Sequence, residues 1–199
     1  MEPVRIVAGR AVPLQRSDVD TDQIIPSQWL KRIERTGFGA GLFAEWRDDP
    51  AFVLNRPEYA GASVLVAGPN FGTGSSREHA VWALVDYGFR AVVSSRFGDI
   101  FRNNATRSGL VPVEVDAATA ASVMAAVAAA PEAEVVIDVE RRLVEVPVAG
   151  LVASFRLDDD ARRRLLEGLD DVGITLRHLD DIDAFEGRRP GFMPDMASN

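Results

Sequence analysis

The chain has 199 residues, of which 47% are hydrophobic and 26% charged, a composition typical of one soluble globular domain. Its net charge of −8 argues against a nucleic-acid surface and against binding to anionic lipid. With no cysteine and only two histidines, it excludes disulfides, thiolate nucleophiles and an iron–sulfur cluster ligated by this chain, and leaves a Cys/His zinc site close to excluded.

The N-terminal part predicts a strand or two over residues 4–15 and then an acidic run. Asp18, Asp20 and Asp22 resemble the start of a calcium loop, but the glycine and closing glutamate of such a loop are missing. A turn whose Asp and Thr side chains bond the neighbouring backbone is therefore favoured, and no metal site is expected. The N-terminus lacks the apolar core of a signal peptide and no window has membrane length, so we expect a cytoplasmic protein.

Residues 29–46 are aromatic and basic, with glycines close together, and predict a shaped loop rather than a long helix. Each aromatic residue taken singly most simply packs on the core. Lys31, Arg32 and Arg35 stand among apolar neighbours, a combination that suggests one wall of a pocket for an anion with an apolar branch.

A glycine-rich stretch, residues 68–80, follows an apolar run of strand composition at 63–67 and precedes a segment with helical spacing. Gly72 and Gly74 allow a sharp turn and a close approach of ligand to backbone. Ser75 and Glu78 have capping-box spacing, which predicts a helix start whose N–H groups favour an anion. Arg77 adds a positive fork suited to a carboxylate or phosphate.

The rest of the chain alternates strands and helices. Helices are predicted from the end of the glycine-rich stretch to Gly88, over 99–108, from Asp116 to Pro131, over 158–166 and over 178–186. Strands are predicted at 91–95 and 110–115, with two or three more between 133 and 155. Pro112 makes the strand at 110–115 an edge or bulged strand. This order predicts a single α/β domain with a mixed sheet over residues 1–186, and a tail, 187–199, that is mobile or docks on a partner.

The glycine-rich stretch does not match several common binding and catalytic motifs. A P-loop needs lysine where Ser75 stands, a dinucleotide fingerprint needs glycine where Arg77 stands, and neither serine has the glycine spacing of a hydrolase elbow. A Ser75–His79 pair is conceivable, but no acidic residue to orient it is identifiable, and a structural role for His79 is favoured. An anion-binding loop remains, with a catalytic role for Ser75 left open.

Residues 72–80 (Gly-Thr-Gly-Ser-Ser-Arg-Glu-His-Ala) resemble the active loop of the swivelling domain of the aconitase superfamily. Together with 20–26 (Asp-Thr-Asp-Gln-Ile-Ile-Pro) and further motifs they are similar to the family of small subunits of bacterial 3-isopropylmalate dehydratases; the further motifs lie at residues 30–32, 35–39, 97–101, 103–104 and 168–176. The resemblance covers residues 4–192, and in combination the motifs are highly specific.

This resemblance implies an aconitase C-terminal-type β/β/α swivelling domain and a hydro-lyase subunit that is active only in a heterodimer. The enzyme would interconvert 2-isopropylmalate and 3-isopropylmalate through isopropylmaleate, in leucine biosynthesis. A large partner subunit would hold a 4Fe–4S cluster as Lewis acid, with no cofactor bound by this chain.

The resemblance also implies roles for individual residues. Ser75 would be the catalytic base, with Ser76 and Arg77 holding a carboxylate of the small dicarboxylate substrate. Leu30 and Lys31, in the loop that distinguishes substrates, would also bind the substrate, with Leu30 contacting the isopropyl branch. Arg16 is a possible second carboxylate-binding arginine. The alternatives are a homoaconitase or methylmalate-type small subunit, and a non-catalytic carboxylate-binding module.

Overall fold

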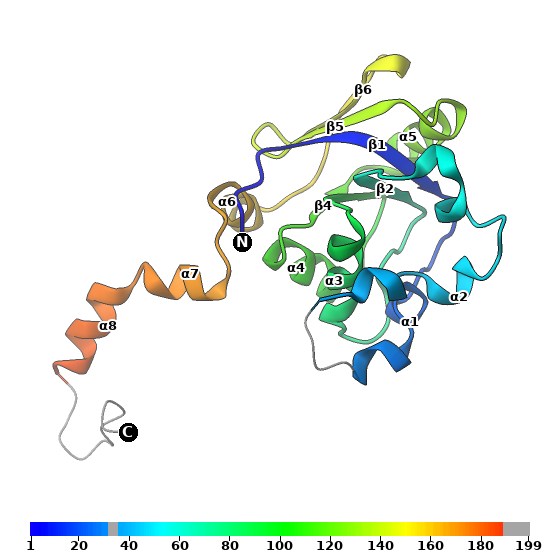
Figure 1. The fold of residues 1–199 in the computed structure, drawn as a ribbon. Coiled ribbons are helices and arrows are strands. Elements are labelled where there is room, and N and C mark those ends of the chain that lie inside the picture. The colour runs from blue at the N-terminus through cyan, green and yellow to red at the C-terminus, as the bar shows by residue number, and fades with distance from the viewer. Residues whose placement is uncertain (32–35, 189–199) are drawn as a thin grey trace.

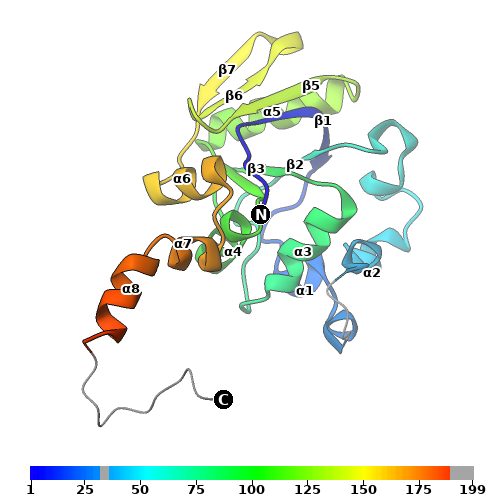
Figure 2. The same ribbon diagram turned by 60° about the vertical axis from the view of Figure 1, so that its left-hand side comes forward.

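A computed structural model of the protein describes residues 1–31 and 36–188. Within these residues seven strands form one sheet, in the order β4-β3-β2-β1-β5-β6-β7 (Figures 1 and 2). The strands are β1 (Ile6–Leu14), β2 (Val64–Ala67), β3 (Ala91–Ser94), β4 (Val111–Glu114), β5 (Glu134–Asp138), β6 (Leu143–Val146) and β7 (Leu151–Ser154). The α-helices are α1 (Thr21–Ile24), α2 (Ala44–Arg47), α3 (Glu78–Tyr87), α4 (Asp99–Arg107), α5 (Ala117–Ala129), α6 (Asp159–Glu167), α7 (Asp171–Leu176) and α8 (Leu179–Glu186). Short 3₁₀ turns are η1 (Ser27–Lys31), η2 (Phe38–Gly41), η3 (Val53–Asn55), η4 (Pro57–Tyr59) and η5 (Pro147–Ala149).

The sheet is mixed, as predicted. Strands β1 to β4 pair in parallel, whereas β5, β6 and β7 continue the sheet from β1 in antiparallel fashion. Strand β1 joins the halves by using residues 6–10 against β5 and residues 11–14 against β2. The edge position predicted for the strand with Pro112 is confirmed, because β4 ends the order. An edge strand tolerates proline because only one of its sides is paired.

Strands β2 and β3 are buried on both faces, as is the second half of β1, so their apolar residues alternate between two cores. In β2, Leu65 packs with the core under α3, while Val64 and Val66 pack with the core under α5 and α6. The antiparallel strands contribute to that second core through residues such as Ile137 and Val144. The sheet is therefore curled around α5 and α6, while α3 covers its other face.

Helix ends follow the sequence signals. Asp116 caps α5 through the Thr119 N–H, and Asp158 caps α6, which ends at Gly168 with positive φ. Helix α7 has no counterpart among the predicted helices, although Asp170 caps it through the Gly173 N–H. The shaped loop predicted for residues 29–46 consists, where described, of the short turns η1, η2 and α2.

The C-terminal helices α7 and α8 extend away from the rest of the molecule (Figures 1 and 2). We refer to residues 171–188 as the C-terminal arm. The predicted tail, 187–199, lies mostly outside the described residues, which end at Arg188. No helix within residues 1–31 and 36–188 is long and apolar enough to cross a bilayer.

Candidate active site

The glycine-rich loop lies at the carboxyl edge of the parallel strands, beside the segments that follow β1 and β3. An isolated parallel bridge joins Asp20 to Thr73, and another joins Phe71 to Phe97. The hydroxyl of Ser94, at the end of β3, donates to the Gly68 carbonyl at 2.8 Å. This edge is where open α/β sheets bind ligands, so the fold brings the predicted loop to a suitable place.

Gly72 and Gly74 of the loop each meet a backbone requirement. Gly72 has φ +75°, and a Cβ at this position would lie 2.3 Å from Cγ of Phe101. Gly74 has φ +88°, and a Cβ there would meet only ordinary van der Waals contacts, so its requirement is conformational rather than steric. The two positions let the chain turn so that Ser75 and Ser76 face outward, where both are exposed.

The backbone of Ser75 is held from the buried side by Thr21, which is 2% exposed. The Thr21 hydroxyl donates to the Ser75 carbonyl at 3.0 Å, and the Thr21 N–H donates to the Thr73 carbonyl at 3.0 Å. Neither serine hydroxyl has a hydrogen-bond partner among the described residues. The loop is thus fixed through its main chain, and the hydroxyl of Ser75 is left available for a ligand.

The capping box predicted for Ser75 and Glu78 is wrong. Helix α3 begins at Glu78 with Arg77 as its N-cap, and no side chain caps it. The capping box instead lies at α1, where Asp20 accepts from the Gln23 N–H and the Gln23 side chain accepts from the Asp20 N–H. The first N–H groups of α3 therefore receive no side-chain cap, so the positive end of the helix dipole lies next to the serines in sequence and is not neutralised by a cap.

Arg77 is 18% exposed and forms an ion pair with Asp22, in the segment after β1. The contact uses the Nη1 nitrogen of Arg77 and the Oδ1 oxygen of Asp22. A guanidinium has five N–H donors, so the pairing orients Arg77 and leaves donors for a further carboxylate. The supporting roles of Thr21 and Asp22 are not predicted from sequence; the only signal for them is membership of the motif at residues 20–26.

The ring of His79 packs against two aromatic rings. Its centroid lies 5.3 Å from that of Phe38 and 4.7 Å from that of Trp82. Among the described residues no hydrogen bond joins His79 to Ser75. The structural role favoured for His79 agrees with this packing, and the Ser–His pair finds no support.

The other predicted site residues come from neighbouring segments. Leu30 is half-buried in η1, close in sequence to α1. Lys31 ends η1, and its side chain, like Arg32 and Arg35 altogether, lies outside the described residues. The guanidinium of Arg16 stacks over Trp46 at 4.1 Å from the ring centroid.

The three alternating aspartates each serve the chain itself. Asp18 accepts a hydrogen bond from Asn70 at 2.7 Å, Asp20 caps α1, and Asp22 pairs with Arg77. The predicted bond from an Asp side chain to the neighbouring backbone is confirmed at Asp20, which accepts from the Gln23 N–H. Thr21 differs from the prediction, because its hydroxyl donates to the distant Ser75 carbonyl rather than to a neighbour in the sequence. Over residues 1–31 and 36–188, no group of three or more His, Cys, Asp or Glu side chains could hold a metal ion.

An exposed hydroxyl, an uncapped helix start and an oriented arginine stand within a few residues of each other. The loop stands on a curled mixed sheet, the kind of α/β domain that the resemblance to the aconitase superfamily predicts. The family model of the aconitase C-terminal domain matches residues 1–118, and the model of the C-terminal domain of the 3-isopropylmalate dehydratase small subunit matches residues 171–194.

Curated relatives extend the likeness to the whole chain. The 3-isopropylmalate dehydratase small subunit of Parafrankia sp. (strain EAN1pec) is 66% identical over 99% of this chain and 100% of its own length. That of Acidothermus cellulolyticus is 61% identical over 98% of both chains. The crystal structure of 3-isopropylmalate dehydratase from Methanocaldococcus jannaschii superimposes with TM-score 0.68 at 28% identity, over 90% of this chain and 99% of that one. The chain belongs to the 3-isopropylmalate dehydratase small-subunit family.

Proposed function

We propose that this chain supplies the proton-transfer half of an active site that interconverts 2-isopropylmalate and 3-isopropylmalate through isopropylmaleate. The observation that carries the proposal is the Ser75 hydroxyl, which is exposed, unpartnered within the described residues and held at its carbonyl by buried Thr21. Family membership supplies the reaction class, a hydro-lyase of leucine biosynthesis.

Ser75 acts as the base. A serine hydroxyl ionises only where its alkoxide is stabilised, and the uncapped N-terminus of α3 and Arg77 supply positive charge beside it. The alkoxide takes a proton from a carbon of the malate, and the C–H electron pair becomes the double bond of isopropylmaleate as the hydroxyl leaves the neighbouring carbon. In the second half, hydroxide adds to the carbon that lost the proton, and Ser75 returns a proton to the other carbon.

Ser76 and Arg77 hold a carboxylate of the substrate. Charge develops on this carboxylate as the carbon-bound proton leaves, so donors fixed before the reaction lower the barrier. The ion pair with Asp22 keeps Arg77 oriented while donors remain for the substrate. Leu30 and Lys31 complete the site from η1, with Leu30 contacting the isopropyl branch. Such an apolar contact contributes about 1–3 kcal/mol of discrimination.

The remaining part of the site belongs to a large partner subunit. This chain has no cysteine, so its residues do not fit a 4Fe–4S cluster, and we assign the cluster to the partner. There it would supply a Lewis acid for the substrate hydroxyl. The substrate is then enclosed between two chains, with residues 1–186 forming one swivelling domain and 187–199 a tail. We place this heterodimer in the cytoplasm.

The test is reconstitution with the large subunit of the same enzyme, followed by the double-bond absorbance of isopropylmaleate. The chain alone is expected to have no turnover, and the mixture to turn over 2-isopropylmalate faster than homocitrate or methylated malates. Robust activity of the isolated chain would refute the division of the site. Preference for another malate would reassign the substrate, and a mixture that binds malate without turnover would indicate a carboxylate-binding module.

A further inference from the structure

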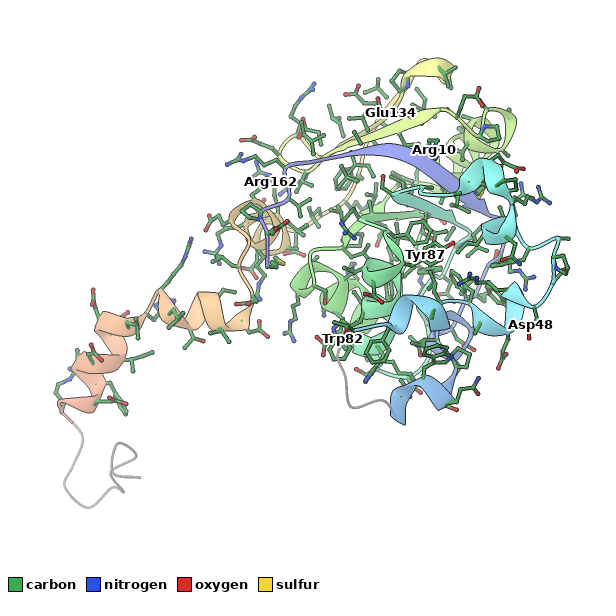
Figure 3. All side chains as sticks on the ribbon, viewed as in Figure 1. Arg10, Asp48, Trp82, Tyr87, Glu134 and Arg162 are labelled. Atoms are coloured by element: carbon green, nitrogen blue, oxygen red, sulfur yellow. The ribbon has the colours of Figure 1, made fainter. Side chains whose placement is uncertain are left out.

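The C-terminal arm carries an apolar stripe that the rest of the described chain leaves uncovered. Leu179 is 48% exposed and Phe185 59% exposed, and no residue of α8 is buried. Leu179, Ile182 and Phe185 recur at three-residue spacing, which places them along one side of the helix. In Figure 3 the side chains of this helix stand clear of those of the main body. Large exposed apolar residues gathered in this way indicate an interaction site.

Acidic residues border the stripe. The arm contains five carboxylates against two arginines, and Asp180, Asp181 and Asp183 lie within α8 itself. One of the arginines, Arg177, is engaged by Glu167 of α6. A surface that receives α8 would therefore present an apolar groove with lysine or arginine on its rim, because such a rim complements the acidic border.

The direction of the arm is set at its root. Arg164 of α6 donates to Asp171 at 2.8 Å, Arg107 of α4 lies 3.6 Å from the same carboxylate, and the N-terminal ammonium lies 3.7 Å from Asp170. These contacts tie α7 to the domain and leave α8 extended beyond it (Figure 2). The arm is thus anchored at one end, while along its apolar stripe Leu179 and Phe185 are exposed and Ile182 is half-buried.

A groove of about 900 Å³ connects the arm with the helix that starts at the active loop. Its lining includes Glu78 and Trp82 of α3, Arg107 of α4 and Val172 of α7. Glu78 follows Ser75 by only three residues, so the groove begins next to the Ser75 loop. A partner that covers this loop could therefore extend along the groove and reach the arm.

We infer that the C-terminal arm docks, through the stripe of Leu179, Ile182 and Phe185, into a basic-rimmed apolar groove of the large partner subunit. The inference rests on the proposed function, which requires that partner to cover the exposed Ser75 loop. Residues 171–194 match a separate family model, that of the C-terminal domain of the 3-isopropylmalate dehydratase small subunit. This match agrees with a role of the arm that is specific to small subunits rather than general to the aconitase C-terminal domain.

The test compares two double variants of the full chain for affinity to the cluster-loaded large subunit, by isothermal titration calorimetry. The arm variant is Leu179→Asp with Phe185→Asp. The control is Val148→Asp with Val152→Asp, because these valines are 68% and 62% exposed and lie in η5 and β7, outside the arm. The arm variant is expected to bind at least about tenfold more weakly, and the control within about twofold of the parent chain.

Equal affinity of the arm variant and the parent chain would overturn the inference. The inference would also be overturned if the arm variant kept its affinity for the large subunit but lost a small-subunit dimer that the parent chain forms in sedimentation. That result would assign the stripe to contact with a second copy of this chain. Turnover separates this inference from the proposed function. At saturating large subunit the arm variant is expected to recover the parental rate, whereas Ser75→Ala stays inactive at any partner concentration. A parent chain that does not bind the large subunit contradicts both.

Discussion

At the residue scale, the position of Ser75 depends on a side chain from another segment. Thr21 lies in α1, is 2% exposed, and donates its hydroxyl to the Ser75 carbonyl at 3.0 Å. Spacing along the chain predicts Ser75, Arg77 and both glycines as one loop, because those residues are neighbours in sequence. It cannot predict Thr21 as their support, since residues 21 and 75 meet only through the parallel pairing of β1 and β2.

This contact predicts that Thr21→Val lowers kcat of the reconstituted enzyme by about 10- to 100-fold, because small displacements of a catalytic group are costly. The KM for 2-isopropylmalate is expected to change little, since Arg77 is held separately by Asp22. Thr21→Ser keeps the hydroxyl and is the matched control, expected to retain most of the activity. Valine and serine variants with equal rates would show that the hydroxyl does not position Ser75.

At the element scale, the helices and strands with strong end signals are predictable. Asp116 and Asp158 are local signals, and each marks the helix start that it predicts. The prediction for the start of α3 fails because a capping-box spacing at Ser75 and Glu78 is only a local preference. The loop is instead tied by the Thr21 and Thr73 contacts, which leave Arg77 as the N-cap. Helix α7 escapes prediction because it is only six residues long.

The α6–α7 corner gives a prediction about stability at this scale. Arg164 is 19% exposed and bonds Asp160 and Asp171, each at 2.8 Å. Arg163 is 55% exposed, and among the described residues its ion pair is with Asp160 alone. We expect Arg164→Ala to lower the local opening free energy of the arm by about 1 kcal/mol and to speed its limited proteolysis about fivefold. Arg163→Ala is the control, and equal cleavage of both variants would contradict the anchoring role.

The same corner has a defined pH dependence. Hydrogen bonds from Arg164 and then Arg163 lower the pKa of Asp160 below its ordinary value. A carboxyl whose folded pKa is depressed stabilises the fold fully above its unfolded pKa, about 3.9, and loses that contribution as the pH falls through the folded value. The loss of stability caused by Arg164→Ala is therefore expected to be constant from neutral pH down to about 5 and to shrink below about 4. Hydrogen exchange of the parent chain and the variant can measure it.

At the scale of the whole molecule, both the composition and the candidate site indicate an active centre shared between this chain and a partner chain. The curled sheet, α3 and the loop at its start place a hydroxyl and a cation at an exposed edge, but the chain has no cysteine to hold a cluster. The mixed sheet is predictable from the alternation of strands and helices. The curl around α5 and α6 is not, because it depends on β1 pairing with β5 and β2 through different residues.

The central claim is that Ser75 transfers the carbon-bound proton, and hydration of isopropylmaleate in D₂O tests it most directly. The Ser75→Ala variant, combined with the large subunit, should incorporate deuterium at carbon at least about 100-fold more slowly than the parent complex. Its affinity for isopropylmaleate should stay within a few fold, because Ser75 caps no helix and its hydroxyl bonds no described residue. Deuterium incorporation near the parental rate would contradict the account.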